Sequence, residues 1–387
     1  MNWFFNKIKQ KNFKEDKSIK KSKEMIESYE VASQWQLMWW KFRKHKLAMI
    51  AGVVLVALYF LAIFCEFFAP YTPLHRFSDH KEAPPSNIRF FDDAGKFSLR
   101  PFIYDVEKTI DPQTFRRVFT ENVESKHYIY FFVRGEPYRM WGIFDTNMHF
   151  IGIESDEIPL FLMGADVLGR DVFTRVLYGS RISLSFGFVS IFFVFIFGMG
   201  LGGLSGYLGG TVDTIVQRLI DLLLSIPGIP LWMALAAALP RDWPPVNIYL
   251  GMVLIMSLLG WTGLARVVRG KLLALREEDF TMAARISGAG HFRIIARHLI
   301  PSFASFIIVS ITLSIPGTIL GETALSFLGL GLQPPVVSWG VLLRDAQRIE
   351  ALAHNPWLLW PAAFMVLAVL GFNFLGDGLR DAADPYK

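Results

Sequence analysis

Long uncharged hydrophobic runs dominate the pattern of this chain. A helix needs roughly 20 apolar residues to cross the hydrocarbon layer of a membrane, and six runs are about that long. They are too long for buried strands and lack the alternation expected in an outer-membrane barrel. The pattern therefore predicts six transmembrane helices, at Leu47–Cys65, Ile182–Leu204, Leu222–Pro240, Trp243–Ala265, Leu299–Gly321 and Asn355–Gly376.

Polar segments of different character separate these helices. We expect a basic N-terminal segment, 1–46, and a first transmembrane helix, 47–68. That helix is predicted to be a retained anchor. The polar segment before it is far longer than the leader of a signal peptide, and no small-residue cleavage site follows the apolar run. An extracytoplasmic loop or insertion, 69–160, comes next, and residues 161–387 form a core with the other five helices.

Lysine and arginine placement predicts the orientation, because cytoplasmic segments carry the excess of these residues. Residues 1–46 hold twelve basic and five acidic residues, and the loop 266–297 holds seven basic and three acidic ones. The loop between the fifth and sixth helices holds two basic and three acidic residues. Six helices with both termini in the cytoplasm satisfy this asymmetry. A nucleic-acid-binding arm at 1–46 is less favoured, because a charge run beside a first span usually signals topology.

An aromatic stretch that favours β-structure lies in the loop between the first two helices, which is expected on the outer side. Tyr128–Val133 and Tyr138–Phe144 are typical of two strands around a turn at Arg134–Pro137. A small β-rich subdomain at about 76–158 is therefore expected. It could dock a partner, cover a pore, or pack on the membrane-embedded helices, and the sequence leaves these alternatives open.

The inner loop 266–297 places hydrophobic residues among charges at mostly helical spacing, with an interruption at Gly288–Gly290. This predicts two short amphipathic helices around a glycine turn. Such a pair can lie on lipid or press its apolar face into a partner protein. Because Ala283 and Ala284 are small where a lipid-bound helix would carry large apolar residues, we favour a partner protein.

Composition agrees with a polytopic membrane protein. The chain is 52% hydrophobic and 19% charged, whereas an ordinary soluble domain carries about 25% charged residues. Its single cysteine, Cys65, allows neither an internal disulfide nor a cysteine-based zinc site. The sequence has no Gly-x-x-x-x-Gly-Lys-Ser/Thr phosphate loop and no clustered metal-ligand set. We therefore expect a non-catalytic chain without cofactor or metal.

Glycines and charges within the predicted helices bear on how the chain works. Gly198, Gly202, Gly206 and Gly210 recur every fourth residue, a spacing that lets another helix approach closely, and we expect them to face a second helical subunit. Glu322 alone among ionisable residues comes near a span and is expected to be an interfacial carboxylate. Ion-coupled carriers usually need intramembrane charges. The chain is thus expected to conduct passively or to take its energy from another subunit.

Several motifs resemble a known family. The segment Met282–Gly288, followed by His298–Pro301, is similar to the "EAA" signature of ABC importer permeases, with Met282 in place of the signature glutamate. Further stretches resemble the dipeptide/oligopeptide branch, over roughly 31–75 and 160–387. They are Met163–Asp171, Arg175–Leu184, Ala324–Gly331 with Pro334, Pro335 and Ser338–Gly340, and Gly376–Asp381 with Asp384 and Pro385.

The resemblance implies an all-α membrane fold with six transmembrane helices and a β-rich extracytoplasmic insertion between the first two. It implies a permease in the bacterial cytoplasmic (inner) membrane that moves peptides or a related oligomeric solute by alternating access. The implied partners are a sister permease subunit forming a heterodimer, two cytoplasmic ABC ATPases and an extracytoplasmic substrate-binding protein. Nucleic acid is not among them. The alternative is a secondary carrier or channel that works without an ATPase, for which internal repeats would be typical.

In that family the inner loop forms the coupling helix, which sits in a cleft of the ATPase. By resemblance, Ala283, Ala284 and Gly288 make the close contact, and Glu278 and Arg285 flank it. Because Met282 replaces the glutamate, a charged contact is either lost or moved to Glu278. Pro301 is expected to join the loop rigidly to the fifth helix. The implied ATPase-coupling residues are Glu278, Met282, Ala283, Ala284, Arg285, Gly288 and Pro301.

Overall fold

The computed structural model of the chain describes residues 33–93, 95–110, 112–113, 117–155, 158–240 and 242–384. Most of the predicted basic segment 1–46 lies outside these ranges. Its described end is helix α2 (Gln34–Lys44), which begins at a capping box between Ser33 and Gln36. The last turn of α2 carries three basic residues directly before the first long apolar helix.

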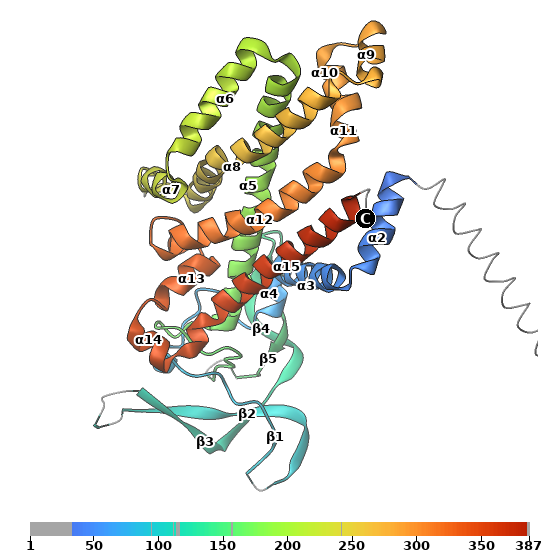
Figure 1. The fold of residues 1–387 in the computed structure, drawn as a ribbon. Coiled ribbons are helices and arrows are strands. Elements are labelled where there is room, and N and C mark those ends of the chain that lie inside the picture. Colours follow the sequence, from blue (N-terminus) through green and yellow to red (C-terminus); the bar gives the residue numbers. More distant parts are fainter. Residues whose placement is uncertain are drawn as a thin grey trace, which may run out of the picture.

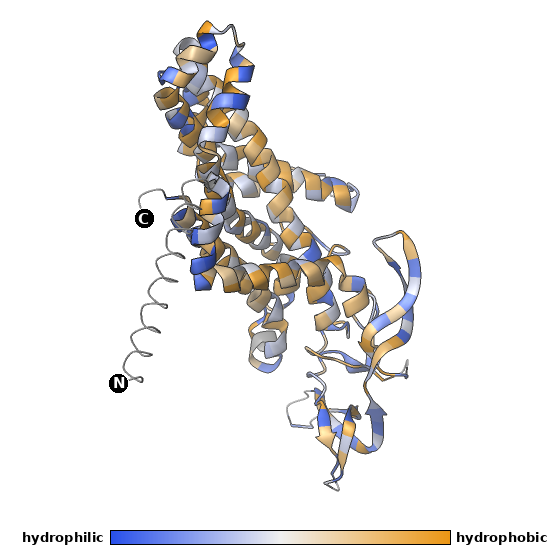
Figure 2. Ribbon diagram, turned by 90° about the vertical axis from the view of Figure 1, so that its right-hand side faces the viewer, coloured by the Kyte–Doolittle hydropathy of each residue, from blue (hydrophilic) through white to orange (hydrophobic). Residues whose placement is uncertain are grey.

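Five segments of the described chain are long and apolar enough to cross a membrane, judged by length and composition. Figure 2 shows these helices mostly in the hydrophobic colour, while the elements beyond their ends are mixed. The segments are α3 (Lys46–Ile63), α5 (Val172–Leu208), α8 (Pro245–Leu275), α12 (Ala304–Phe327), and η3 (Pro356–Leu359) with α15 (Trp360–Ala383).

A bent pair of helices stands where the sequence predicts the third span. Helices α6 (Gly210–Ser225) and α7 (Gly228–Ala237) meet at an angle of 86°. Pro227 lies in the break, and a proline cannot donate the backbone hydrogen bond that would continue α6. The predicted span Leu222–Pro240 therefore covers the end of α6, the break and α7. The described chain holds five candidate spans, or six if the bent pair counts as one.

Helix α5 runs through the middle of the bundle and crosses α8 (Figure 1). A Cβ added at Gly202 would lie 2.6 Å from the carbonyl oxygen of Ala265, and one at Gly198 would lie 2.8 Å from Leu264. Since α8 of the same chain occupies the glycine stripe at these positions and at Gly206, the expectation that the stripe faces a second subunit is wrong.

Helix α15 packs against both α3 and α12. Gly371 faces Leu55 of α3, and Gly376 faces Leu313 of α12. The small residues let three long helices approach closely and form one core with α5 and α8. Short elements complete this part of the chain: α4 (Cys65–Phe68), η1 (Ser78–His80), α13 (Trp339–Asp345) and α14 (Ile349–His354).

The segment between α4 and α5 contains all the strands of the described residues, below the helices in Figure 1. Three form an antiparallel sheet in the order β1-β2-β3, and two form a separate antiparallel hairpin. The strands are β1 (Arg89–Phe91), β2 (Phe97–Ile110), β3 (Arg117–Tyr128), β4 (Tyr130–Met140) and β5 (Phe144–Gly152).

The turn of the β4–β5 hairpin differs from the predicted one. Strand β4 continues through Arg134–Pro137, where the pairing register shifts against β5, and the chain reverses only at Trp141–Ile143. The placement of the turn at Arg134–Pro137 is therefore wrong. Glycine and proline at those positions mark an irregularity within a strand, while the actual turn uses Gly142 with a φ of 72°.

Candidate functional site

The polar end of the molecule opposite the strands carries the segment singled out from the sequence (Figure 1). It starts where α8 ends at Leu275 and leads into α12. Its elements are α9 (Asp279–Ile286), α10 (His291–Arg293), the π-helical turn η2 (Ile294–Leu299) and α11 (Ile300–Ser302). We refer to residues Asp279–Ser302 as the α9–α11 segment. Helix α9 precedes the interruption at Gly288–Gly290, and α10, η2 and α11 follow it as one continuous helical run, so two short helical stretches flank the glycine turn as the sequence predicts.

Gly288 ends α9 in a left-handed conformation, with a φ of 78°. The Gly288 N–H donates to the Arg285 carbonyl oxygen at 3.0 Å, and the Ala289 N–H donates to the Ala284 carbonyl oxygen at 3.1 Å. This pair of bonds is a Schellman motif, for which glycine is preferred because it has no Cβ to clash in that conformation. The glycine therefore makes the sharp turn between α9 and α10.

Buried contacts fix the inner face of the α9–α11 segment. The Thr281 hydroxyl donates to the carbonyl oxygen of Leu275 at 2.8 Å, which ties α9 to the end of α8, and Thr281 is fully buried. Ala284 and Ala289 pack against the main helical core, and Ile294 belongs to it. The segment is thus an integral part of the helical bundle.

Tyr207, near the end of α5, holds the same segment from a second side. Its hydroxyl lies 3.3 Å from His291 Nδ1, and its ring meets the His291 ring edge-on at 5.3 Å. The guanidinium carbon of Arg285 lies 5.9 Å from the centre of the Tyr207 ring, within range of a cation–π interaction. Displacement of the segment would therefore act on α5 as well as on α8.

The outer face of the segment exposes large apolar side chains. Ile286 and Phe292 flank the glycine turn, and each is 85% exposed. Phe280 and Met282 on α9 are 43% and 41% exposed. Fixed apolar side chains on an otherwise charged loop are typical of a surface that binds another protein.

The predicted coupling residues divide between the two faces. Ala283 and Gly288 are exposed, whereas Ala284 is half-buried against its own chain. Glu278 is exposed at the N-cap of α9. Pro301 is exposed in α11, which ends before Phe303. Because the backbone of Phe303 leaves the helical conformation (φ −124°), the joint to α12 is interrupted at this point.

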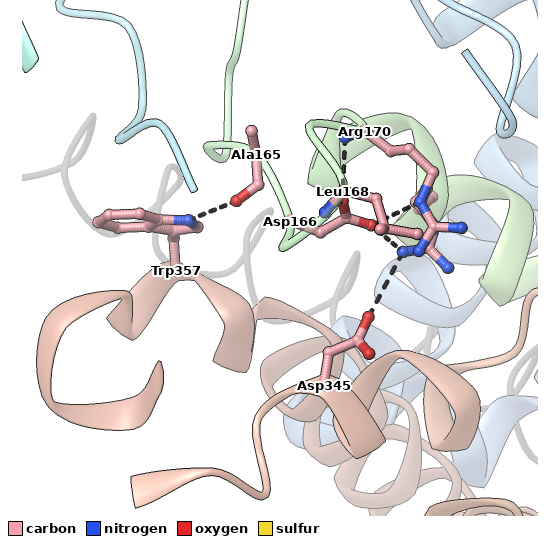
Figure 3. Close-up of polar contacts among 7 residues, drawn as sticks. Ala165, Asp166, Leu168, Arg170, Asp345 and Trp357 are labelled. Carbon is pink, nitrogen blue, oxygen red and sulfur yellow. Dashed lines mark hydrogen bonds and ion pairs between the residues drawn. The ribbon is translucent and has the colours of Figure 1, made fainter. Parts of the chain in front are cut away.

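A second polar cluster lies near the strand end of the bundle (Figure 3). The Asp166 carboxylate accepts backbone N–H groups of Leu168 at 2.8 Å and Arg170 at 3.0 Å, and it pairs with the guanidinium groups of Arg170 and Arg175. Arg175 of α5 also lies 3.6 Å from Asp345 of α13. Burial raises the pKa of Asp345, and the Arg175 charge offsets this in part.

Glycines in the same loop allow close packing against distant segments. Gly164 has a φ of 80°, and an added Cβ would lie 2.5 Å from the Trp357 ring. The Trp357 indole N–H donates to the Ala165 carbonyl oxygen at 2.9 Å (Figure 3). At Gly169 an added Cβ would overlap the Phe77 carbonyl oxygen. The stretch Met163–Asp171 thus joins the start of α5 to α13 and η3, and its buried ion pairs hold these elements together.

Glu322 of α12 is fully buried, so the prediction of an interfacial carboxylate is wrong. Its carboxylate accepts the hydroxyl groups of Ser326 and Ser338, each at 2.8 Å, and of Ser183 at 3.3 Å. These partners come from α12, the N-cap of α13 and α5. Hydroxyl donors from three elements satisfy the buried group, and the cluster locks those elements together.

Sequence patterns did not single out several residues that shape these sites. Thr281 and Tyr207 have no special spacing, and their role depends on contacts between helices far apart in the chain. Ile286 and Phe292 follow the helical pattern, but only the fold separates exposed from buried apolar positions. Within the described ranges, no group of three or more His, Cys, Asp or Glu residues could hold a metal ion.

Two family models match the chain. Residues 198–386 match the binding-protein-dependent transport system inner membrane component. Residues 33–85 match the N-terminal transmembrane domain of oligopeptide transport permease C. The second match ends at residue 85 and the first begins at 198, so all five strands fall between the two matched ranges.

Curated relatives agree with these matches. The chain is 41% identical over 223 residues to the dipeptide transport system permease protein DppC of Bacillus subtilis, covering 57% of this chain and 68% of the relative. It is 42% identical over 243 residues to the oligopeptide transport system permease protein OppC of Haemophilus influenzae, covering 62% and 75%. A solved structure of the MetNI methionine ABC transporter shows a TM-score of 0.40 at 20% identity, over 54% of this chain and 95% of that one.

Proposed function

The chain belongs to the family of binding-protein-dependent transport system inner membrane components, in the dipeptide and oligopeptide permease branch, and on this premise we propose how it works. It is a permease subunit of an ABC importer that carries peptides or a related oligomeric solute by alternating access. Two partner ATPases on the cytoplasmic side supply the energy, and the chain itself catalyses no reaction. This function is favoured over a secondary carrier or channel.

The main support for this proposal is that Ile286 and Phe292 are exposed on the α9–α11 segment, which contacts with α8 and α5 hold in place. An ATPase surface that covers both side chains would remove much apolar area from water. Movement of that surface would pass to α8 through Thr281 and to α5 through Tyr207. ATP drives the change by binding one arrangement of the assembly better than the other, since a ligand shifts an equilibrium only by its differential affinity.

Individual residues take the following proposed roles at this interface. Met282, Ala283 and Gly288 face the ATPase, with Ile286 and Phe292 beside them. Glu278 supplies the acidic contact that Met282 does not, and Arg285 flanks the interface from its place over Tyr207. Ala284 supports α9 from the inner side. Pro301 starts the short α11 turn that leads to α12.

The topology follows from the same premise. The α9–α11 segment and both termini lie in the cytoplasm, and the bent pair α6–α7 counts as one of six spans. The basic segment comprises residues 1–46 and the first span residues 47–68. The outer insertion comprises residues 69–160, and the permease core comprises residues 161–387. The insertion is the β-rich outer part between the first two spans. A sister permease completes a heterodimer, and a substrate-binding protein delivers cargo to the strand end.

Phe292→Asp tests this proposal in the assembled importer. Phe292 is 85% exposed, so a charged side chain there leaves the permease fold intact but opposes burial in an apolar interface. The measurement is ATP hydrolysis stimulated by cargo-loaded binding protein, in liposomes that contain all subunits. We expect the stimulation to be lost while the variant inserts and unfolds as the wild type does. Stimulation at the wild-type level would refute the proposed interface.

A further inference from the structure

The tip of the β4–β5 hairpin is fixed against the end of α3, a candidate span. The Trp141 indole N–H donates to the carbonyl oxygen of Ile63, the last residue of α3, at 2.8 Å. The Trp141 backbone N–H lies 3.4 Å from Glu66 Oε1, and Arg181 of α5 pairs with the same carboxylate. Three elements thus hold the hairpin tip at the level where the first apolar helix ends.

Aromatic rings connect α3 with the hairpin tip without a gap. The ring of Phe60 lies 4.9 Å from that of Phe64, which lies 5.4 Å from that of Trp141. The Trp141 ring lies 6.5 Å from that of Phe144 at the start of β5. The apolar surface of the helix therefore continues onto the hairpin.

A second row of rings runs along the body of the hairpin. Phe60 contacts Phe68 at 5.8 Å between ring centres, and Phe68 contacts Phe150 at 5.3 Å. Phe150 in turn contacts Phe131 at 5.5 Å and Phe132 at 5.7 Å. The two rows together form an aromatic surface on the helix and the hairpin. With Ile143, which lies in the turn between Trp141 and Phe144, we call it the hairpin patch. Its residues are Phe60, Phe64, Phe68, Phe131, Phe132, Trp141, Ile143, Phe144 and Phe150.

Most side chains of this patch are exposed, whereas Phe64, Phe68 and Phe150 are half-buried. Ile143 at the tip is 69% exposed, Phe132 is 61% and Phe144 is 59%. On α3 the exposed row Val53, Val56 and Phe60 leads directly to the patch. An apolar surface of this kind needs a covering partner. Trp and Tyr gather where a membrane meets water, because their apolar rings carry a polar N–H or O–H group, and Trp141 at the hairpin tip is such a residue.

We infer that the hairpin patch lies in the outer interface of the lipid bilayer, with Trp141–Phe144 in contact with lipid. The inference rests on the proposed function, since it takes α3 as a membrane span. Lipid is the occupant because the patch continues the exposed row of α3. The ion pair between Arg139 and Asp145, at 2.7 Å and widely exposed, lies beside the tip, where polar headgroups would meet it. The insertion thereby anchors in the membrane beside its own first span.

Spin labelling in the complete importer tests this placement. Cys65 is the only cysteine and is buried, so Cys65→Ala provides the background for single new cysteines. Ile143→Cys carries the probe at the tip, and Phe144→Cys repeats the measurement at a neighbouring site. Val56→Cys marks lipid, and Leu99→Cys, at an 88% exposed position of β2, marks water. The complex is embedded in phospholipid nanodiscs, and collisions with oxygen and with a water-soluble nickel chelate are measured.

We expect the ratio of oxygen to nickel-chelate collisions at 143 and 144 to be several-fold above that at 99 but below that at 56, because oxygen concentrates and the chelate is excluded towards the middle of the bilayer. A ratio equal to that at 99 would show that the hairpin is in water and overturn the inference. Low collision with both reagents at 143 and 144 would show a protein cover and overturn it equally. If position 56 also collides freely with the nickel chelate, the membrane placement of α3, and with it the proposed function, fails instead.

Discussion

Replacing Ile286 with alanine should weaken the association of the permease with its ATPase partner. Ile286 is 85% exposed in the isolated chain, so the substitution removes few contacts within the fold. Full burial of an isoleucine side chain stabilises by about 1.5–3 kcal/mol, and alanine keeps roughly a third of that. The association should therefore lose about 1–2 kcal/mol, which corresponds to a dissociation constant about 5- to 30-fold higher.

The assay is equilibrium binding of the purified ATPase to the permease heterodimer in nanodiscs, without nucleotide and with ATP. Ile349→Ala is the matched control, because Ile349 is also 85% exposed but lies on α14 near the other end of the bundle. The control should bind as the wild type does, and both variants should keep the wild-type unfolding temperature. Equal affinity of Ile286→Ala and wild type would show that the ATPase does not cover Ile286, since a covered isoleucine cannot be truncated without loss of affinity.

Two further predictions concern the bundle itself. Gly202→Ala should lower the unfolding temperature in detergent, because the new Cβ would lie 2.6 Å from the Ala265 carbonyl oxygen. Gly200→Ala on the same helix is the control; its Cβ meets no described atom within 4 Å, so this variant should be neutral or slightly stabilising. Equal effects of the two variants would contradict the α5–α8 packing. Burial raises the pKa of the Asp171 carboxyl from its ordinary 3.8 to about 7. Between these two pH values the folded state holds a proton that the unfolded chain has released, so the stability of the fold should decrease as the pH rises from 3.8 to about 7. Asp171→Asn should reduce that fall in unfolding temperature, and an unchanged pH dependence would contradict it.

The family and the positions of the long helices could be predicted from the sequence. Hydrophobic length identified five segments because burial in lipid demands the same apolar run whatever the neighbours are. The motifs around Ala283 and Asp166 placed the chain in its family, and the family matches confirm that resemblance. Each of these signals is local and is readable without the fold.

The wrong predictions share a physical cause. The glycine stripe predicted a close helix contact but could not say whose helix, and α8 of the same chain is the neighbour. Glu322 lies at the end of a hydrophobic run, where hydropathy suggests the membrane surface. Three serine hydroxyls from separate elements nevertheless surround its carboxylate. Gly135 and Pro137 suggested a turn that the hairpin places at Trp141–Ile143. In each case tertiary contacts decided between local alternatives.

The central claim is that this chain moves its cargo only with energy from partner ATPases. The most direct measurement is uptake of labelled peptides into liposomes, with the chain alone or in the full importer. We expect ATP-dependent accumulation in the full importer, and none by the chain alone with ATP or with an imposed proton or sodium gradient. Accumulation of peptide by the chain alone under either condition would show that it transports without partner ATPases.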